Sequence, residues 1–343
     1  MAMNDYLISI FMPVYNGSNY LEKSIKSIIN QTFKNFELLC VDDSSTDNSY
    51  EIIKKFAVMD PRVRVYNKPN GGNVPKSWNY IKSEFNGNGI MYMSQDDLMS
   101  TDNLEKLYKK YKETDADAVF PDMEFYNEGK KNNRRLIGVD GDREAIISGK
   151  KAVILNLNLK IPGCPLWQSH LFEGILFPED TFNSDEFITR KLLLKANKVA
   201  FCDGVFYYRQ DNNNAITKTF DLKNYYALNT NLLDYNLLKL NKFKEKEIAS
   251  YCWSIHHMYL EIYKKFNKNY GIKNLEEKEA VEIFLKEFYI LIDKPTILIL
   301  LNYRTGIKKI KVLILYSIFY NFKILKSCLK FMQILDFYRS IKN

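Results

Sequence analysis

Apolar and polar positions follow two alternating patterns along roughly the first 120 residues of the chain. Five short runs rich in apolar residues, typical of strands buried in a sheet, lie at 7–12, 36–41, 63–66, 89–93 and 116–120. Between them, apolar residues recur at helical spacing, as at Leu21, Ile25 and Ile28. Asn19 and Glu22 are placed to form a capping box on that helix. The pattern predicts an α/β fold, with a mostly parallel sheet flanked by helices.

The pattern is less regular from about residue 130 to 220 and becomes helical and rich in aromatic residues after 222. The elements expected in the irregular part are two helices and two short strands, at 148–155, 184–196, 199–201 and 205–208. The two strands are compatible with a hairpin. We therefore expect an α/β domain over residues 1–220 and a helical C-terminal region over 221–343.

The net charge of the chain is concentrated in its last fifty residues. The sequence carries 49 Lys and Arg against 41 Asp and Glu, a formal net charge of +8. Residues 294–343, the basic tail, hold ten of the basic residues and a single acidic one. The nearly neutral remainder argues against nucleic acid as a partner. Apolar runs in the tail indicate either binding to an anionic membrane surface or packing on the core with solvated lysines. A contact between subunits of an oligomer is compatible with both interpretations of the tail.

Nothing in the sequence predicts secretion or a membrane-spanning helix. The apolar run 7–14 is short, lacks a positively charged flank and includes Pro13. No stretch has the ~20 apolar residues that a spanning helix needs. The five cysteines are scattered and form no CxxC pair, which is typical of thiols in a reducing compartment. We expect a cytoplasmic protein, peripheral on the inner face of the cell membrane if the basic tail binds lipid.

Polar residues follow three of the predicted strands at the point where each strand ends. They are Tyr15 and Asn16, Asp42 and Asp43, and Asp96 and Asp97. Because ligands of open α/β sheets bind at the carboxyl ends of the strands, this shared placement predicts one binding site. Adjacent carboxylates suit a hard divalent cation that bridges two phosphates. Taken alone, Asp42–Asp43 is equally well explained as a cap on the next helix, and Asp96–Asp97 is better explained as a turn that caps the helix after it.

A further acidic residue, Asp185, opens the predicted helix 184–196 together with Glu186. Acidic residues in a first helical turn are favoured by the helix dipole, which is a sufficient structural explanation. The functional alternative is a general base that accepts a proton from a hydroxyl group. The chain has neither a GxxxxGK[ST] phosphate loop nor a GxSxG nucleophile elbow. These absences argue against a P-loop nucleotide-hydrolysing enzyme and against an α/β-hydrolase.

The N-terminal part of the chain resembles the family 2 glycosyltransferases, which have the GT-A fold. The matching stretches are Ile10–Asn16, Gln31–Phe33 with Phe36–Glu37, Val41–Ser49 and Met93–Asp97. The resemblance is strong over about 5–127 and weaker to about 217, where Ser184–Phe187 and Tyr207–Gln210 fit. It implies a nucleotide-sugar half at about 1–127 and an acceptor half at about 128–220.

The resemblance also implies an activity and a set of site residues. The expected reaction is inverting transfer of a hexosyl or N-acetylhexosaminyl group from a nucleoside-diphosphate sugar, usually a UDP-sugar. The expected acceptor is a hydroxyl of a glycan or lipid-linked glycan, in the synthesis of a bacterial surface polysaccharide. The implied donor-binding residues are Pro13, Tyr15, Asn16, Asp43 and Asp96, with Asp97 as ligand of Mn²⁺ or Mg²⁺ and Asp185 as catalytic base. Many members have an acid where this chain has Ser94, so Asp97 is the one expected direct metal ligand.

Two other functions fit the fold class. A sugar-1-phosphate nucleotidyltransferase needs a glycine-rich phosphate loop near its N-terminus that ends in basic residues, and Pro13–Asn16 supplies none. A catalytically inactive nucleotide-sugar-binding module is the second alternative. The presence of Asp43, Asp97 and Asp185 argues against it.

Overall fold

The computed structural model describes residues 6–161, 163–215, 218, 222–268 and 272–291. The chain divides into two compact units, one of residues up to 180 together with 184–218, the other of 181–183 together with the residues from 219 onward. Within the described parts of the chain, no helix is long and apolar enough to cross a membrane. The basic tail lies outside the described residues, so its expected membrane or packing role stays a prediction.

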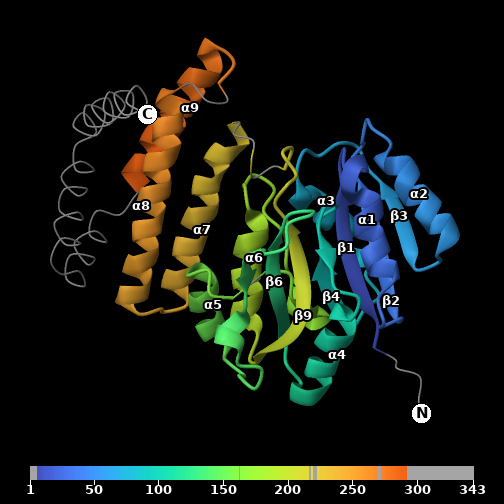
Figure 1. Ribbon diagram of the computed structural model, residues 1–343. Helices are drawn as coiled ribbons and strands as arrows, with labels where there is room; N and C mark the ends of the chain where they lie inside the picture. Colours follow the sequence, from blue (N-terminus) through green and yellow to red (C-terminus); the bar gives the residue numbers. More distant parts are fainter. Residues whose placement is uncertain (1–5, 162, 216–217, 219–221, 269–271, 292–343) are drawn as a thin grey trace. The chain divides into compact units, whose positions relative to one another are not determined.

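Four parallel strands form the first part of the sheet in unit 1 (Figure 1). They are β1 (Ile8–Val14), β2 (Phe36–Asp42), β3 (Val63–Asn67) and β4 (Gly89–Tyr92). β1 lies between β2 and β4, and β3 pairs with the other edge of β2. β2 is buried along its whole length and β1 along most of it, which explains why their sequences are mostly apolar. The first four predicted strands are confirmed.

Five more strands continue the sheet beyond β4. They are β8 (Leu166–Gln168), β6 (Ala118–Tyr126), β9 (Val199–Arg209), β5 (Leu98–Met99) and β7 (Arg135–Leu136). β8 runs antiparallel to β4 and β6, while β6 and β9 are parallel to each other. β5 and β7 pair antiparallel with β9 and β6. The predicted α/β class is confirmed, and this part of its sheet is mixed.

Residues 199–209 form one strand, so the predicted hairpin is wrong. β9 runs parallel to β6 with a shift of register, because Phe120 pairs with Phe201 whereas Asp122 pairs with Val205. The turn-like sequence around Gly204 is therefore a bulge that does not reverse the chain. A Cβ atom at Gly204 would lie 2.4 Å from Asn103 Oδ1, so the glycine permits close approach of helix α4 (Asn103–Thr114).

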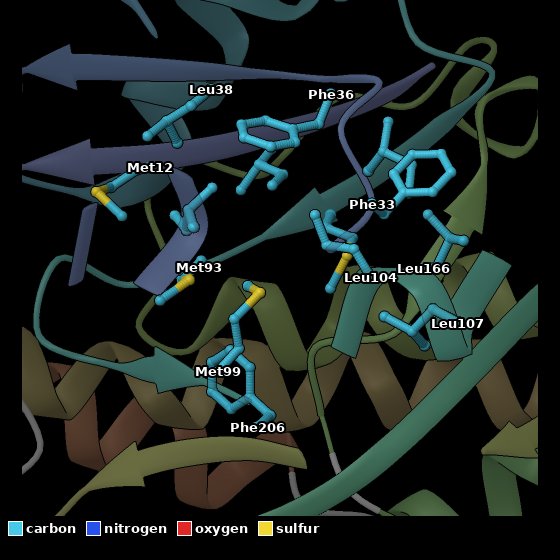
Figure 2. Close-up of a cluster of buried hydrophobic side chains, with 14 of the residues drawn as sticks. Met12, Phe33, Phe36, Leu38, Met93, Met99, Leu104, Leu107, Leu166 and Phe206 are labelled. Carbon is cyan, nitrogen blue, oxygen red and sulfur yellow. The ribbon is translucent and has the colours of Figure 1, made fainter. Parts of the chain in front are cut away.

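Helices cover both faces of the sheet. Those of unit 1 are α1 (Ser18–Ile29), α2 (Ser49–Met59), α3 (Val74–Ile81), α4 (Asn103–Thr114), α5 (Gly149–Leu157) and α6 (Ser184–Lys195). One face packs against α1, α2 and α4 in a core cluster that includes Met12, Leu38, Met93, Leu104 and Phe206 (Figure 2). The helices predicted near 148–155 and 184–196 are confirmed as α5 and α6.

The opposite face is organised around Trp78 on α3. Phe11 of β1 meets the Trp78 ring edge-on at 5.3 Å, and the Phe177 ring lies 4.7 Å from it. Asn79 holds the same segment, since its Nδ2 donates to Phe177 O at 2.9 Å and to Glu179 Oε1 at 2.9 Å. Helix α3 therefore anchors the segment that precedes Asp185 in the chain.

Helix α1 begins without the predicted capping box of Asn19 and Glu22. Its N-cap is Gly17, and the first amides are satisfied from the loop after β2. Gly17 N donates to Ser49 Oγ at 2.8 Å, and the next amide donates to Asp47 Oδ2 at 3.1 Å. The prediction failed because these acceptors come from a distant part of the sequence.

The described part of unit 2 is helical. It contains a short 3₁₀ helix (Leu222–Tyr226), α7 (Ala227–Leu240), α8 (Glu245–Asn267) and α9 (Leu275–Leu291). The Tyr251 hydroxyl of α8 lies 2.9 Å from Asn231 Oδ1 and 3.0 Å from Asp234 Oδ2 of α7. The helical character predicted after residue 222 is confirmed for these residues.

Candidate active site

The carboxyl ends of β1, β2 and β4 place the predicted donor residues at one edge of the sheet. Pro13 lies within β1 opposite Val41, and Tyr15 follows the strand with 47% of its surface exposed. Asp43 directly follows β2, while Asp96 and Asp97 lie shortly after β4. Parallel pairing of the three strands makes these positions neighbours.

The backbone of Tyr15 is held by Gln95, a residue that the sequence did not single out. Tyr15 N donates to Gln95 Oε1 at 2.9 Å, and Gln95 Nε2 donates to Tyr15 O at 2.9 Å. A single amide side chain thus satisfies both backbone groups. The Tyr15 backbone is fixed, and its ring is left largely exposed to solvent.

Asn16 shapes the loop after β2. Its φ of 48° places it in the left-handed region, which asparagine tolerates better than most residues. Its Oδ1 accepts from Thr46 N at 2.7 Å, and its own N–H donates to Ser45 Oγ at 3.0 Å. The described contacts of Asn16 therefore lie within the protein, and donor contact stays a prediction.

Asp43 is buried and organises the loop after β3. Its Oδ1 accepts from Gly71 N at 2.7 Å and pairs with the buried ammonium of Lys68, while Oδ2 accepts from Gly72 N at 3.1 Å. Among the described residues, Oδ2 therefore receives a single hydrogen bond from this loop. A second acceptor position remains for a nucleobase N–H.

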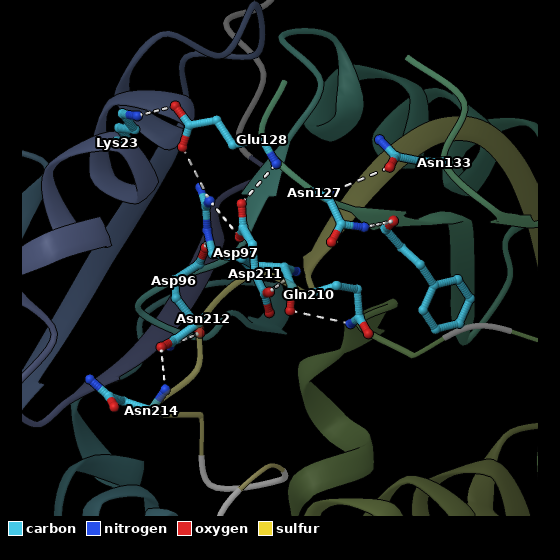
Figure 3. A network of polar contacts seen from close by, with 12 residues as sticks. Lys23, Asp96, Asp97, Asn127, Glu128, Asn133, Gln210, Asp211, Asn212 and Asn214 are labelled. Carbon is cyan, nitrogen blue, oxygen red and sulfur yellow. Dashed lines mark hydrogen bonds and ion pairs between the residues drawn. The ribbon is translucent and has the colours of Figure 1, made fainter. Parts of the chain in front are cut away.

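The pair Asp96–Asp97 has a different environment. Asp97 is 3% exposed and its Oδ1 accepts from Arg209 N at 2.9 Å, whereas Asp96 Oδ2 accepts from Asn212 Nδ2 at 2.7 Å (Figure 3). Desolvation raises the pKa of Asp97 well above its ordinary value, and the neighbouring charge of Asp96 raises it further. A carboxylate in this position is stabilised by a nearby cation.

Arg209, at the end of β9, holds this acidic turn. Its side chain is fully buried, and Nε donates to Asp96 O at 2.7 Å. Its Nη1 contacts Asp211 Oδ1 at 3.0 Å and Glu128 Oε2 at 3.4 Å. Its guanidinium also lies over the Tyr20 ring at 4.7 Å. Arg209 therefore links the acidic turn to α1 and to the segments that follow β6 and β9.

The donor atoms of this turn fit a divalent metal that is shared with a ligand. Carboxylate oxygens suit Mn²⁺ or Mg²⁺. Across the described residues, no group of three or more His, Cys, Asp or Glu side chains is arranged to hold a metal ion alone. One carboxylate, Asp97, would therefore bind the metal while phosphate oxygens and water complete its coordination.

Asp185, in the first turn of α6, belongs to the same charge cluster as Asp97. Desolvation raises the pKa of Asp185 to about 6, and the negative charge of Glu186 adds to this shift. Desolvation also raises the pKa of the Cys164 thiol and of the Tyr92 phenol, and in both cases the charges of Asp97 and Asp185 add to the effect. Both carboxylates therefore lie near the same two side chains.

The family described as "Glycosyl transferase family 2" matches residues 9–170. Glycosyltransferase GlyG of Streptococcus pneumoniae serotype 4 is 32% identical over 225 residues, which are 63% of this chain and 75% of GlyG.

The chain belongs to glycosyl transferase family 2. The predicted enzyme class is confirmed, and family membership decides against the nucleotidyltransferase alternative. Two solved structures share the fold of this family 2 glycosyltransferase. TarS 1–349 of S. aureus in complex with UDP-GlcNAc has a TM-score of 0.63 at 18% identity, covering 85% of this chain and 83% of that one. Mannosyltransferase PcManGT of Pyrobaculum calidifontis, in complex with GDP-Man and Mn²⁺, has a TM-score of 0.52 at 14% identity, covering 91% and 86%.

Four residues of the site carry no motif of their own in the sequence. They are Lys68, Gln95, Cys164 and Arg209. Gln95 and Arg209 lay in stretches that the family resemblance marked, without a role. Lys68 reaches the site through its ion pair with Asp43, and Cys164 lies within reach of the charges of Asp97 and Asp185, so local spacing gave no signal for either.

Replacement of Arg209 by lysine should loosen the acidic turn. Arg209→Lys keeps the charge, but one ammonium group cannot bond to Asp96 O, Asp211 and Glu128 together. We expect the free energy of unfolding to fall by ~1–3 kcal/mol and UDP to bind more weakly in the presence of Mn²⁺, measured by denaturant titration and calorimetry. The exposed Arg135→Lys is the control. If both variants behave like the parent, Arg209 does not hold the turn.

Proposed function

We propose that this family 2 glycosyltransferase is an inverting, metal-dependent enzyme that transfers a sugar from a UDP-sugar to a glycan hydroxyl in the synthesis of a bacterial surface polysaccharide. The observation that carries the proposal is that Tyr15, Asp43 and the buried Asp97 follow paired parallel strands at one edge of the sheet. Asp185, suited to act as a base, lies close enough to Asp97, suited to anchor the diphosphate, for the charges of both to act on Cys164 and Tyr92.

The nucleotide would bind along β1 and β2. The exposed Tyr15 ring would pack on the nucleobase, and Asp43 Oδ2 would accept from a base N–H. Asp96, oriented by Asn212, would contact the ribose. UDP is proposed because TarS, which shares the fold, was solved with UDP-GlcNAc.

Asp97 would hold the metal, as expected from its unusual electrostatic environment. A bound Mn²⁺ or Mg²⁺ supplies positive charge that neutralises the departing diphosphate. Arg209 N and Asn212 keep the two carboxylates of the turn oriented toward their separate roles. PcManGT, another protein with this fold, was solved with Mn²⁺, which supports the choice of metal.

Asp185 would accept the proton of the acceptor hydroxyl. The hydroxyl oxygen forms the new bond to the anomeric carbon while the bond from that carbon to the diphosphate oxygen breaks. Attack from the side opposite the departing diphosphate inverts the anomeric configuration. With a pKa of about 6, Asp185 is ionised at neutral pH and is more basic than an ordinary aspartate.

Removal of the metal ligand should abolish metal-dependent turnover. Asp97→Asn keeps the size of the side chain but loses its charge, so we expect release of UDP from a UDP-sugar in the presence of Mn²⁺ to fall ~100-fold or more. Asp60→Asn, which alters an acid paired with Arg62 outside the site, should leave turnover unchanged. Full activity in Asp97→Asn would show that the metal lies elsewhere.

The pH dependence of kcat/KM should report the ionisation of Asp185. Below about pH 6 Asp185 becomes protonated and cannot accept a proton, so kcat/KM should fall about tenfold per pH unit there and level off above. Glu186→Gln should move this limb to lower pH, because it removes a charge that raises the pKa of Asp185. Asp185→Asn should lower kcat ~100- to 10,000-fold without weakening UDP binding.

The variants Glu186→Gln and Asp185→Asn also test whether Asp185 or another group is the base. Glu186→Gln is the matched control for Asp185→Asn, because Glu186 is the adjacent acid and its carboxylate pairs with Arg190 at 2.8 Å. A pH limb that stays in place in Glu186→Gln, or an active Asp185→Asn, would exclude Asp185 as the base. Absence of turnover in the parent with every donor tried would instead favour the inactive binding module.

The acceptor is proposed to be a glycan or lipid-linked glycan, reached at a membrane surface through the basic tail. The ten cations of residues 294–343 would each contribute ~1 kcal/mol near an anionic surface. We expect the full chain to co-sediment with anionic phospholipid vesicles, unlike a variant that ends at Asp293. Equal sedimentation of the two proteins, or equal binding to neutral phosphatidylcholine vesicles, would contradict this role of the tail.

A further inference from the structure

Gln95 joins two turns that the proposed donor would contact at opposite ends. It lies immediately before Asp96, and its amide makes reciprocal hydrogen bonds with the backbone of Tyr15 at 2.9 Å each. These bonds connect the end of β4 to the turn between β1 and α1. They extend the contact between the two strands beyond the last paired residues, Phe11 and Tyr92.

Gly17 lies against the same amide group. A Cβ atom at Gly17 would be 2.3 Å from Cδ and Oε1 of Gln95 and 2.9 Å from Nε2. The backbone of Gly17 has φ −106° and ψ 10°, a conformation open to residues other than glycine. The glycine is therefore required by the Gln95 side chain rather than by its own backbone angles.

The amide cannot move aside without losing its partners. The end of a glutamine side chain is ordinarily flexible, so a clash with it costs little. Here both polar atoms of the amide are bonded to Tyr15, and a displaced amide would leave the Tyr15 N–H and C=O without these bonds. A methyl group at Gly17 would therefore act on the Tyr15 backbone through Gln95.

We propose that Gly17 and Gln95 form a positioning device that sets the spacing between the nucleobase residue Tyr15 and the acidic turn, in which Asp96 is the ribose residue and Asp97 the diphosphate residue. The inference rests on the proposed function, which assigns these residues to a nucleoside diphosphate. A ligand that spans both ends binds more tightly when their separation is fixed in advance, because no ordering is needed on binding. Gln95 and Gly17 act through Tyr15 and the acidic turn, and need not touch the ligand.

A double-mutant cycle tests the contact. The proteins are the parent, Gln95→Ala, Gly17→Ala and the double variant, and the measurements are the Kd for UDP with Mn²⁺ by calorimetry and the Tm. We expect each single variant to raise the Kd about tenfold. The double variant should bind no more weakly than Gln95→Ala, since the Gly17 methyl then occupies space that the amide has left.

Gln168→Ala is the matched control. Gln168 also makes a reciprocal pair, in which Tyr6 Oη donates to its Oε1 at 3.1 Å and its Nε2 donates to Tyr6 Oη at 2.8 Å. It pairs with Gly89 at the beginning of β4, at the other end of that strand from the acidic turn. We expect Gln168→Ala to lower the Tm and leave the Kd for UDP unchanged.

The possible outcomes separate the inference from the function on which it rests. Additive effects of about a hundredfold in the double variant, or equal loss of UDP affinity in Gln168→Ala, would overturn the positioning device. The positioning device would also be overturned if Gln95→Ala bound UDP as tightly as the parent while Tyr15→Ala bound it weakly. Unchanged affinity in Tyr15→Ala would overturn the nucleobase site itself.

Discussion

The parallel pairing of β1 with β2 on one side and β4 on the other is the constraint on which the proposed donor site depends. β1 pairs with β2 over its whole length, from Ile8–Phe36 to Val14–Asp42, and with β4 up to Phe11–Tyr92. Its side chains are almost entirely buried, so the strand cannot slip without exposing apolar surface. Each loop that follows these strands therefore starts from a fixed point, and hydrogen bonds between the loops complete the arrangement.

Two buried acids at this edge are treated in opposite ways by the fold. Asp43 has the ammonium group of Lys68 and two backbone amides as partners, so its charge is compensated within the protein. Asp97 receives the backbone amide of Arg209, while desolvation and the charge of Asp96 disfavour its ionised form. The charge of Asp43 is thus balanced within the protein, whereas that of Asp97 is only partly compensated and would be stabilised by a bound cation. The ends of β2 and β4, on either side of β1, therefore differ in how the fold compensates an acid.

Local patterns were sufficient to predict the strands that lead to the site, because runs as rich in apolar residues as 36–41 indicate burial on both faces. They failed where a residue's partner is distant. Gly204 looks like a turn but lies in a bulge beside α4, and the first amides of α1 bind Asp47 and Ser49 instead of a capping box. Gln95 was overlooked for the same reason, since its importance comes from contacts across two strands.

The attachment of residues 177–179 to α3 has a consequence for engineering. Asn79 and the Trp78 ring hold the backbone and the Phe177 side chain of this segment, which leads to Asp185. The proposed nucleotide-sugar half therefore also supports the approach to the proposed base. A chimera designed to exchange acceptor preference between relatives cannot exchange the proposed acceptor half independently of the proposed nucleotide-sugar half. It has to transplant the contact surface of α3 along with the segment that rests on it.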